Sequence, residues 1–136
     1  MIIDGKNKIL GRIASFAAKK ALEGEKVEII NCEEIIITGN KKMSLKKFKE
    51  RRDRGDPHKG PYYPRMSDRI VRRAIRGMLP YKQEKGKVAF SKIKCFIGTP
   101  KGMEEVIKLE TRPIRTKDFL RIKQISNFLG AKTNGR

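Results

Sequence analysis

The chain has 136 residues, of which 38% are hydrophobic, and it carries a formal net charge of +19 at neutral pH. This length suits a single domain, and clustered apolar runs argue against a disordered polycation. Because no apolar run approaches about 18 residues and the opening MIIDGKNKIL lacks the features of a secretory signal, we expect a cytoplasmic protein without a membrane span.

The amino-terminal part of the chain predicts a strand, a helix and two further strands. The first strand is the apolar run 1–3. Between Gly11 and Gly24, apolar residues recur at the 3.6-residue spacing of a helix, and the second glycine is suited to end it. The β-branched runs 27–31 and 34–38 predict strands. Strand, helix and strand in this order indicate a βαβ unit with a parallel sheet.

A basic helix and a loop are expected next. Residues 41–52 predict a strongly basic helix in which only Leu45 and Phe48 face inward. The following segment, 52–66, has the sequence RDRGDPHKGPYYPRM, with two glycines and three prolines. These residues exclude a long regular element, so we expect an extended loop.

The next helix has two distinct faces. It is predicted to begin at Ser67, a good N-cap residue, and to end at Pro80. One face is apolar and consists of Ile70, Val71, Ala74, Ile75, Met78 and Leu79. A separate basic stripe consists of Arg69, Arg72, Arg73 and Arg76. Like charges at this spacing destabilise an isolated helix by a few tenths of a kcal/mol per pair, so the stripe makes physical sense if it docks on phosphates.

The carboxy-terminal third is less regular. A turn is expected around Gly86, followed by a strand over residues 93–98. Residues 106–110 fit either a strand or an extended arm. Residues 117–129 predict a last helix that Gly130 stops.

Positive charge is distributed unevenly along the chain. Residues 1–40 carry six basic and six acidic side chains, residues 41–76 carry fourteen and four, and residues 77–136 carry fourteen and five. This segregation indicates a folded scaffold that presents charge from particular surfaces, for which nucleic acid is the commonest partner. An anionic membrane suits the chain less well, because no basic amphipathic helix with exposed aromatic residues stands out.

The sequence offers little for metal binding or catalysis. Cys32 and Cys95 stand singly in apolar runs and His58 is the only histidine, so we expect two buried small side chains and no metal site. There is no G-x-G-x-x-G after the first strand and no G-x-x-x-x-G-K-[ST]. No serine or cysteine has a nearby base. We therefore expect no enzyme, no cofactor and no small-molecule substrate.

The basic segment 41–76 is the strongest candidate for RNA contact. Its charges are largely uncompensated, and arginine, whose planar fork suits phosphates and stacks on bases, dominates from Arg51 onward. Tyr62 and Tyr63 lie within this segment, and aromatic rings among basic side chains stack on unpaired RNA bases. Packing of the two tyrosines against the domain is an equally good interpretation.

Two stretches of the sequence are distinctive: LGRIASFAAKKALEGEKVEIINCEEIIITGNK and GPYYPRMSDRIVRRAIRGMLPYK. Together they closely resemble the universal large-subunit ribosomal protein thirteen family. The G-R-x-A-S start, the V-x-I-I-N and I-x-G strand pair, and the R-x-x-x-R-G-M-L-P helix end recur in that family in this order. The resemblance covers about residues 2–100, and the form of the loop KGPYYPRMSDRI is similar to members of the archaeal or eukaryotic branch. The last predicted helix, before GAK, is similar to archaeal-type members.

The resemblance implies a fold, a role and a set of partners. The expected fold is α/β: a three-layer α/β/α single domain with a mainly parallel four-stranded sheet, basic loops and a carboxy-terminal extension. We expect one domain over residues 1–136, with an α/β core in 1–100 and a basic arm and helix in 101–136. The resemblance further implies a structural constituent of the large ribosomal subunit that binds its ribosomal RNA, supports early subunit assembly, contacts neighbouring large-subunit proteins and uses no cofactor.

The residues expected to bind RNA are basic and aromatic side chains from the segment 41–76, together with one basic residue before this segment and one after it. They are Arg12, Lys41, Lys42, Lys46, Arg51, Arg52, Arg54, Lys59, Tyr62, Tyr63, Arg65, Arg69, Arg72, Arg73, Arg76 and Lys82. Two other hypotheses remain. An enzyme on a nucleotide-binding-like fold would explain the βαβ opening, and charge alone permits a general binder of duplex DNA, although no helix-turn-helix or zinc finger is present.

Overall fold

The computed structural model describes residues 1–103, 105–112 and 114–132. Residues 133–136, at the end of the predicted carboxy-terminal extension, lie outside this range. Within the described residues, no helix has both the length and the apolar character needed to cross a membrane.

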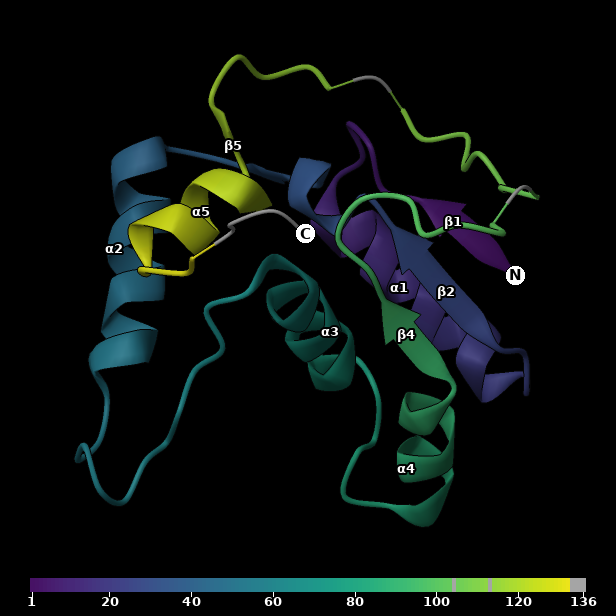
Figure 1. The fold of residues 1–136 in the computed structure, drawn as a ribbon, viewed down its shortest axis with the longest axis horizontal. Coiled ribbons are helices and arrows are strands. Elements are labelled where there is room, and N and C mark those ends of the chain that lie inside the picture. Colours follow the sequence, from purple (N-terminus) through teal and green to yellow (C-terminus); the bar gives the residue numbers. More distant parts are fainter. Residues whose placement is uncertain (104, 113, 133–136) are drawn as a thin grey trace.

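Three short strands form a small parallel sheet, on the right in Figure 1. Its strands are β1 (Ile2–Asp4), β2 (Val27–Ile30) and β4 (Ile93–Cys95), hydrogen-bonded in the order β1-β2-β4. Both pairs are parallel, with β2 in the middle. Helix α1 (Leu10–Leu22) connects β1 to β2, as the predicted βαβ unit requires. The α/β class predicted from the sequence is confirmed.

Helix α1 buries a face made almost entirely of alanine. Its buried residues are Ile13, Ala14, Ala17, Ala18 and Ala21. Such short side chains let a neighbouring helix approach closely, and α1 packs against both α3 and α4. The spacing of these residues in the sequence therefore serves helix packing as well as contact with the sheet.

The fourth strand does not join the parallel sheet, so the predicted four-stranded sheet is wrong. Strand β3 (Ile36–Thr38) instead pairs antiparallel with β5 (Phe119–Arg121) in a separate two-stranded sheet. Only a short 3-10 turn, η1 (Cys32–Glu34), separates β2 from β3. Parallel neighbours need a crossover of about a dozen residues or more, so this connection is too short to put β3 beside β2.

The predicted basic helix and the loop after it are both confirmed. Helix α2 (Lys41–Asp53) begins after Asn40, whose side chain accepts hydrogen bonds from the backbone of Lys42 and Met43. Phe48 is its only buried residue. The segment that follows reaches α3 with a single isolated bridge, between Asp56 and Gly60.

Helix α3 (Ser67–Gly77) buries the predicted apolar face. Ile70, Val71 and Ile75 are at most 1% exposed, and Leu79 just beyond the helix is 4% exposed. Two details of the prediction are wrong. Ser67 is the first helical residue and not the cap, and its buried hydroxyl has no hydrogen-bond partner among the described residues. Met78 is 46% exposed because the chain leaves the helix before it.

Two elements of the carboxy-terminal third differ from the prediction. Gly86 lies inside helix α4 (Glu84–Ser91) and not in a turn. A Cβ atom at this glycine would collide with the Pro80 carbonyl oxygen, so the residue allows a close backbone approach. The predicted helix over 117–129 is divided into β5 and a shorter helix, α5 (Ile122–Phe128), because the first residues pair with β3.

Residues 106–110 form an extended arm along the edge of the sheet. Their one bridge joins Ile107 to Ile3, where the Ile107 amide donates to the Ile2 carbonyl at 2.8 Å. Figure 1 shows the chain then crossing back to set β5 and α5 beside α2. Ile122, Ile125 and Leu129 complete the same hydrophobic core as the amino-terminal residues.

We predict that Gly86→Ala destabilises the fold, because the added methyl group meets the backbone of Pro80. The expected loss in the free energy of unfolding is about 1–3 kcal/mol, measured by urea denaturation. Gly11→Ala is the matched control: this helical glycine has no atom within 4 Å of a Cβ position, so the variant should gain up to about 1 kcal/mol. Equal stability of the Gly86→Ala variant and the parent chain would contradict this account of α4.

Candidate nucleic-acid interface

The arginine stripe of α3 is partly held by aromatic rings. Arg69 is exposed, whereas Arg72, Arg73 and Arg76 are half-buried. The guanidinium carbon of Arg72 lies 4.2 Å from the centroid of the Phe90 ring, and that of Arg76 lies 4.7 Å from the Tyr81 ring. Stacking on a ring restricts a guanidinium while leaving its N–H edge able to bind an anion.

Arg72 also supports the sheet. Its Nε donates a hydrogen bond to the carbonyl oxygen of Ile93 at 3.3 Å, at the start of β4. The members of the stripe therefore differ in how closely they contact the folded core. Arg72 connects α3 to β4, and Arg69 on the same helix is the freely exposed member.

The predicted lysines of α2, Lys41, Lys42 and Lys46, are all exposed. At the other end of the helix, the guanidinium carbon of Arg51 lies 5.2 Å from the Phe48 ring and 5.9 Å from the Tyr63 ring. The helix therefore carries its charge on the surface, with one arginine oriented by rings at its end.

Among the remaining predicted cations, Arg52 is tied into the fold. It is half-buried, donating to the Asp53 carboxylate at 3.1 Å and to the Leu129 carbonyl at 3.5 Å. The others from this part of the prediction are exposed: Arg54, Lys59, Arg65 and Lys82.

The two tyrosines of the loop have different environments. Tyr63 is half-buried and packs edge-on against Phe48, with ring centroids 6.0 Å apart. Tyr62 is 69% exposed, and its hydroxyl donates to the Pro57 carbonyl at 3.2 Å. Of the two interpretations of this pair, packing applies to Tyr63, and Tyr62 is the ring exposed to solvent.

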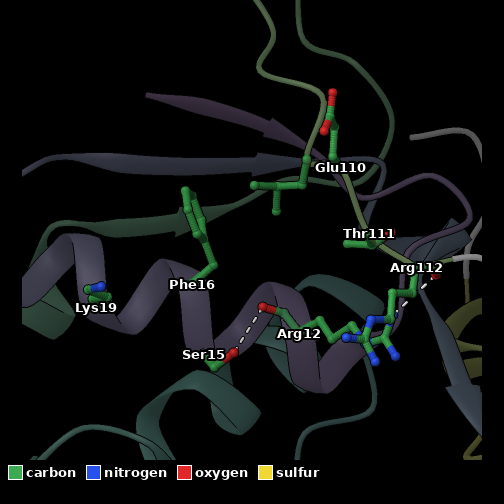
Figure 2. A pocket seen from close by; sticks show the side chains of 8 residues that line it. Arg12, Ser15, Phe16, Lys19, Glu110, Thr111 and Arg112 are labelled. Atoms are coloured by element: carbon green, nitrogen blue, oxygen red, sulfur yellow. Dashed lines mark hydrogen bonds between the residues drawn. The ribbon is translucent and has the colours of Figure 1, made fainter.

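Arg12 lies in a different cleft from the other predicted residues (Figure 2). This cleft, of about 630 Å³, lies between α1 and the arm 109–112. Within it, the guanidinium of Arg12 donates to the carbonyl oxygen of Arg112 at 3.1 Å. Arg12 therefore holds the arm against α1, a role that its sequence motif did not indicate.

Other predicted residues are brought together in clefts. One cleft is lined by Tyr62, Tyr63, Arg65 and Arg69, and by Lys132 from the end of the described chain. A second lies along α2 and is lined partly by Lys46 and Arg54. Sequence reasoning missed Lys132, because no local motif marks it and only the fold of α5 brings it beside the loop.

The predicted cations are largely without acidic partners. In the part of the chain that the structure describes, Arg52 is the only one of them within 4 Å of a carboxylate. The ion pairs of Lys20 with Glu23 and Glu25 and of Arg121 with Glu34 lie elsewhere. Uncompensated cations of this kind attract a polyanion, and the attraction weakens as salt is added.

The comparison with known families decides the identity of the chain. Its residues 1–102 match the family described as ribosomal protein L13. The chain belongs to the ribosomal protein L13 family. This confirms the resemblance found in the sequence, and it confirms a ribosomal protein rather than an enzyme.

Relatives within the L13 family extend the match to most of the chain. Large ribosomal subunit protein uL13 of Methanococcus maripaludis is 44% identical over 136 residues, covering 97% of this chain and 98% of the relative. The protein of the same name from Methanopyrus kandleri is 44% identical over 121 residues, covering 89% and 76%. That from Methanocaldococcus jannaschii is 41% identical over 135 residues, covering 96% and 98%. These archaeal sources agree with the archaeal-type resemblance.

The two cysteines form a pair that the sequence did not suggest. Cys32 is buried as expected, but Cys95 is only half-buried. The Cys32 thiol donates to the Ile29 carbonyl at 3.6 Å. The neighbouring Cys95 thiol, together with burial, raises the pKa of Cys32 well above its usual range. Within the described residues, no group of three or more His, Cys, Asp or Glu side chains is arranged to hold a metal ion.

We predict that Arg72→Gln destabilises this L13 protein and that Arg69→Gln does not. The first substitution removes the bond to Ile93 and the stacking on Phe90, at a cost of about 1–2 kcal/mol in the free energy of unfolding. The second changes an exposed side chain, with an expected effect within about 0.5 kcal/mol. Urea denaturation measures both, and equal effects would contradict a structural role for Arg72.

We predict that Cys32 resists alkylation in the folded chain. Its raised pKa keeps the thiol protonated at neutral pH, so its reaction with iodoacetamide should be slow there and rise only at alkaline pH. Mass spectrometry of the labelled chain measures this, with the urea-unfolded chain as the control. Labelling of Cys32 at equal rates in the folded and unfolded chains at neutral pH would contradict the prediction.

Proposed function

We propose that this L13 protein is a structural constituent of the large ribosomal subunit that binds ribosomal RNA through α2, the segment 54–66 and α3. The observation that carries the proposal is the set of exposed, uncompensated cations on these elements, interleaved with aromatic rings, in a chain of a ribosomal protein family. Many of these cations are arginines, whose planar guanidinium group is well suited to binding phosphates.

The proposed binding surface has a rigid framework. The buried faces of α2 and α3 hold its backbone, and rings at Phe48, Tyr81 and Phe90 restrict three of its arginines. Side chains that are already ordered lose less conformational entropy when they bind. This arrangement suits a protein that docks on folded RNA as a preformed surface and supports early subunit assembly.

The remaining parts of the proposal follow from this role. The chain works in the ribosome, in the cytoplasm, with neighbouring large-subunit proteins as its protein partners. Arg12 and Lys82 stay in the proposed set of RNA-binding residues, although Arg12 bonds to the arm in the free chain. The division into a core of residues 1–100 and an arm of 101–136 stays a prediction.

A salt titration of the full chain on transcribed large-subunit ribosomal RNA tests the proposal. Each phosphate contact contributes roughly −0.7 to −0.9 to the slope of log affinity against log salt. A variant with Lys42→Gln, Arg54→Gln and Arg69→Gln, all exposed positions, should therefore lose roughly 2 to 3 units of slope without a change in unfolding.

Lys20→Gln is the matched control for this titration. Two carboxylates, from Glu23 and Glu25, already pair with this lysine, so its substitution should leave the slope unchanged. A slope near zero for the parent chain would contradict the proposed function. Equal affinity for random duplex DNA and for ribosomal RNA would favour a general DNA binder instead.

A further inference from the structure

One cleft has the chemistry of a site for a single nucleotide. It opens between the loop that precedes α3 and the end of α5, has a volume of about 610 Å³, and is called here the Tyr62 cleft. Of the described residues that line it, three are cations and none is a carboxylate. The cations are Arg65, Arg69 and Lys132. Aromatic and apolar residues, among them Tyr62, Tyr63 and Met66, make up most of the remaining lining.

The two walls of the Tyr62 cleft are fixed to each other. The hydroxyl of Ser126 in α5 donates to the Arg65 carbonyl at 2.7 Å, and it is buried. Arg52 donates to the Leu129 carbonyl at 3.5 Å, which ties the end of α2 to the same helix end. Because the Ser126 bond exists in the free chain, the two walls are already joined before a ligand binds.

The ring of Tyr62 is held at its edge while most of its surface stays exposed. Its hydroxyl bonds to the Pro57 carbonyl, and the ring lies so near Gly60 that a Cβ atom there would be 3.1 Å from its Cε2. Yet 69% of the residue is exposed. A tyrosine that is only filling space would be covered, as Tyr63 is. An anchored and exposed ring is a stacking platform.

The exposed ring and the cations of the Tyr62 cleft together favour unpaired over paired RNA. A base inside a duplex is already stacked and cannot reach a ring, so a duplex would engage only the cations. An unpaired nucleotide offers both a base face and a phosphate. We propose that the Tyr62 cleft binds one unpaired nucleotide of RNA, with its base stacked on Tyr62 and its phosphate at Arg65 and Arg69. This rests on the proposed function and narrows it to one kind of RNA element.

The test compares two RNA probes on the full chain: a short single-stranded RNA carrying one photoreactive iodouracil, and the same strand annealed to its complement. Tyr62→Ala should weaken binding of the single strand roughly 5- to 100-fold, as loss of a stacked base does. It should change binding of the duplex less than about two-fold, because no cation is removed. Irradiation of the parent complex should crosslink the single strand to Tyr62.

Two further variants separate stacking from other effects. Tyr62→Phe keeps the ring and should retain most of the affinity. Tyr81→Ala removes another exposed tyrosine, whose ring Arg76 already covers, and should not distinguish the two probes. Circular dichroism and the thermal midpoint of Tyr62→Ala should match those of the parent chain.

The outcomes separate this inference from the proposed function. Equal losses for both probes, or no loss for either, would overturn the nucleotide site while salt-dependent binding of ribosomal RNA still supports the function. A crosslink found only outside the Tyr62 cleft would overturn it as well. If the parent chain binds neither probe nor ribosomal RNA, both the inference and the proposed function fail.

Discussion

Burial of one face of α3 determines where its arginines point. Ile70, Val71 and Ile75 are almost fully buried, and the alanine face of α1 lets the two helices approach closely. Rotating α3 would bring guanidinium groups into that contact, and an unpaired buried charge costs several kcal/mol. The apolar contact therefore sets which way the basic face of α3 points, and the ring contacts of Arg72 and Arg76 then restrict these two side chains.

Buried packing of β5 and α5 in turn positions the loop that precedes α3. Strand β5 pairs with β3, and α5 then adds Ile122, Ile125 and Leu129 to the core. From this position Ser126 and the end of α5 hold the segment before α3 by its backbone. Ordering such a loop costs considerable conformational entropy, and these contacts offset part of that cost. Packing far along the chain thus orders the part with the most exposed aromatic ring.

The sequence predicted the features that depend on the spacing of neighbouring residues. The helices at α1, α2 and α3 follow from their apolar spacing, and the exposed lysines of α2 follow from the scarcity of apolar residues there. Two features depend on partners distant in sequence: residues 119–121 pair with β3, and Arg72 bonds to β4. A third, the helical position of Gly86, depends on the fold of the short connection that brings the Pro80 backbone beside α4. The different roles of Tyr62 and Tyr63 belong to the same class, because neighbouring identical residues give no signal that only one meets Phe48.

We propose that one continuous part of the chain, α2 through α3, faces the RNA. The sharpest test is crosslinking of the chain within assembled large ribosomal subunits, mapped by mass spectrometry to individual amino acids. Most crosslinked residues should then fall within positions 41–82, with Tyr62 and Arg69 among them. Crosslinks concentrated on the exposed face of α1 and on α4, with none in 41–82, would contradict it.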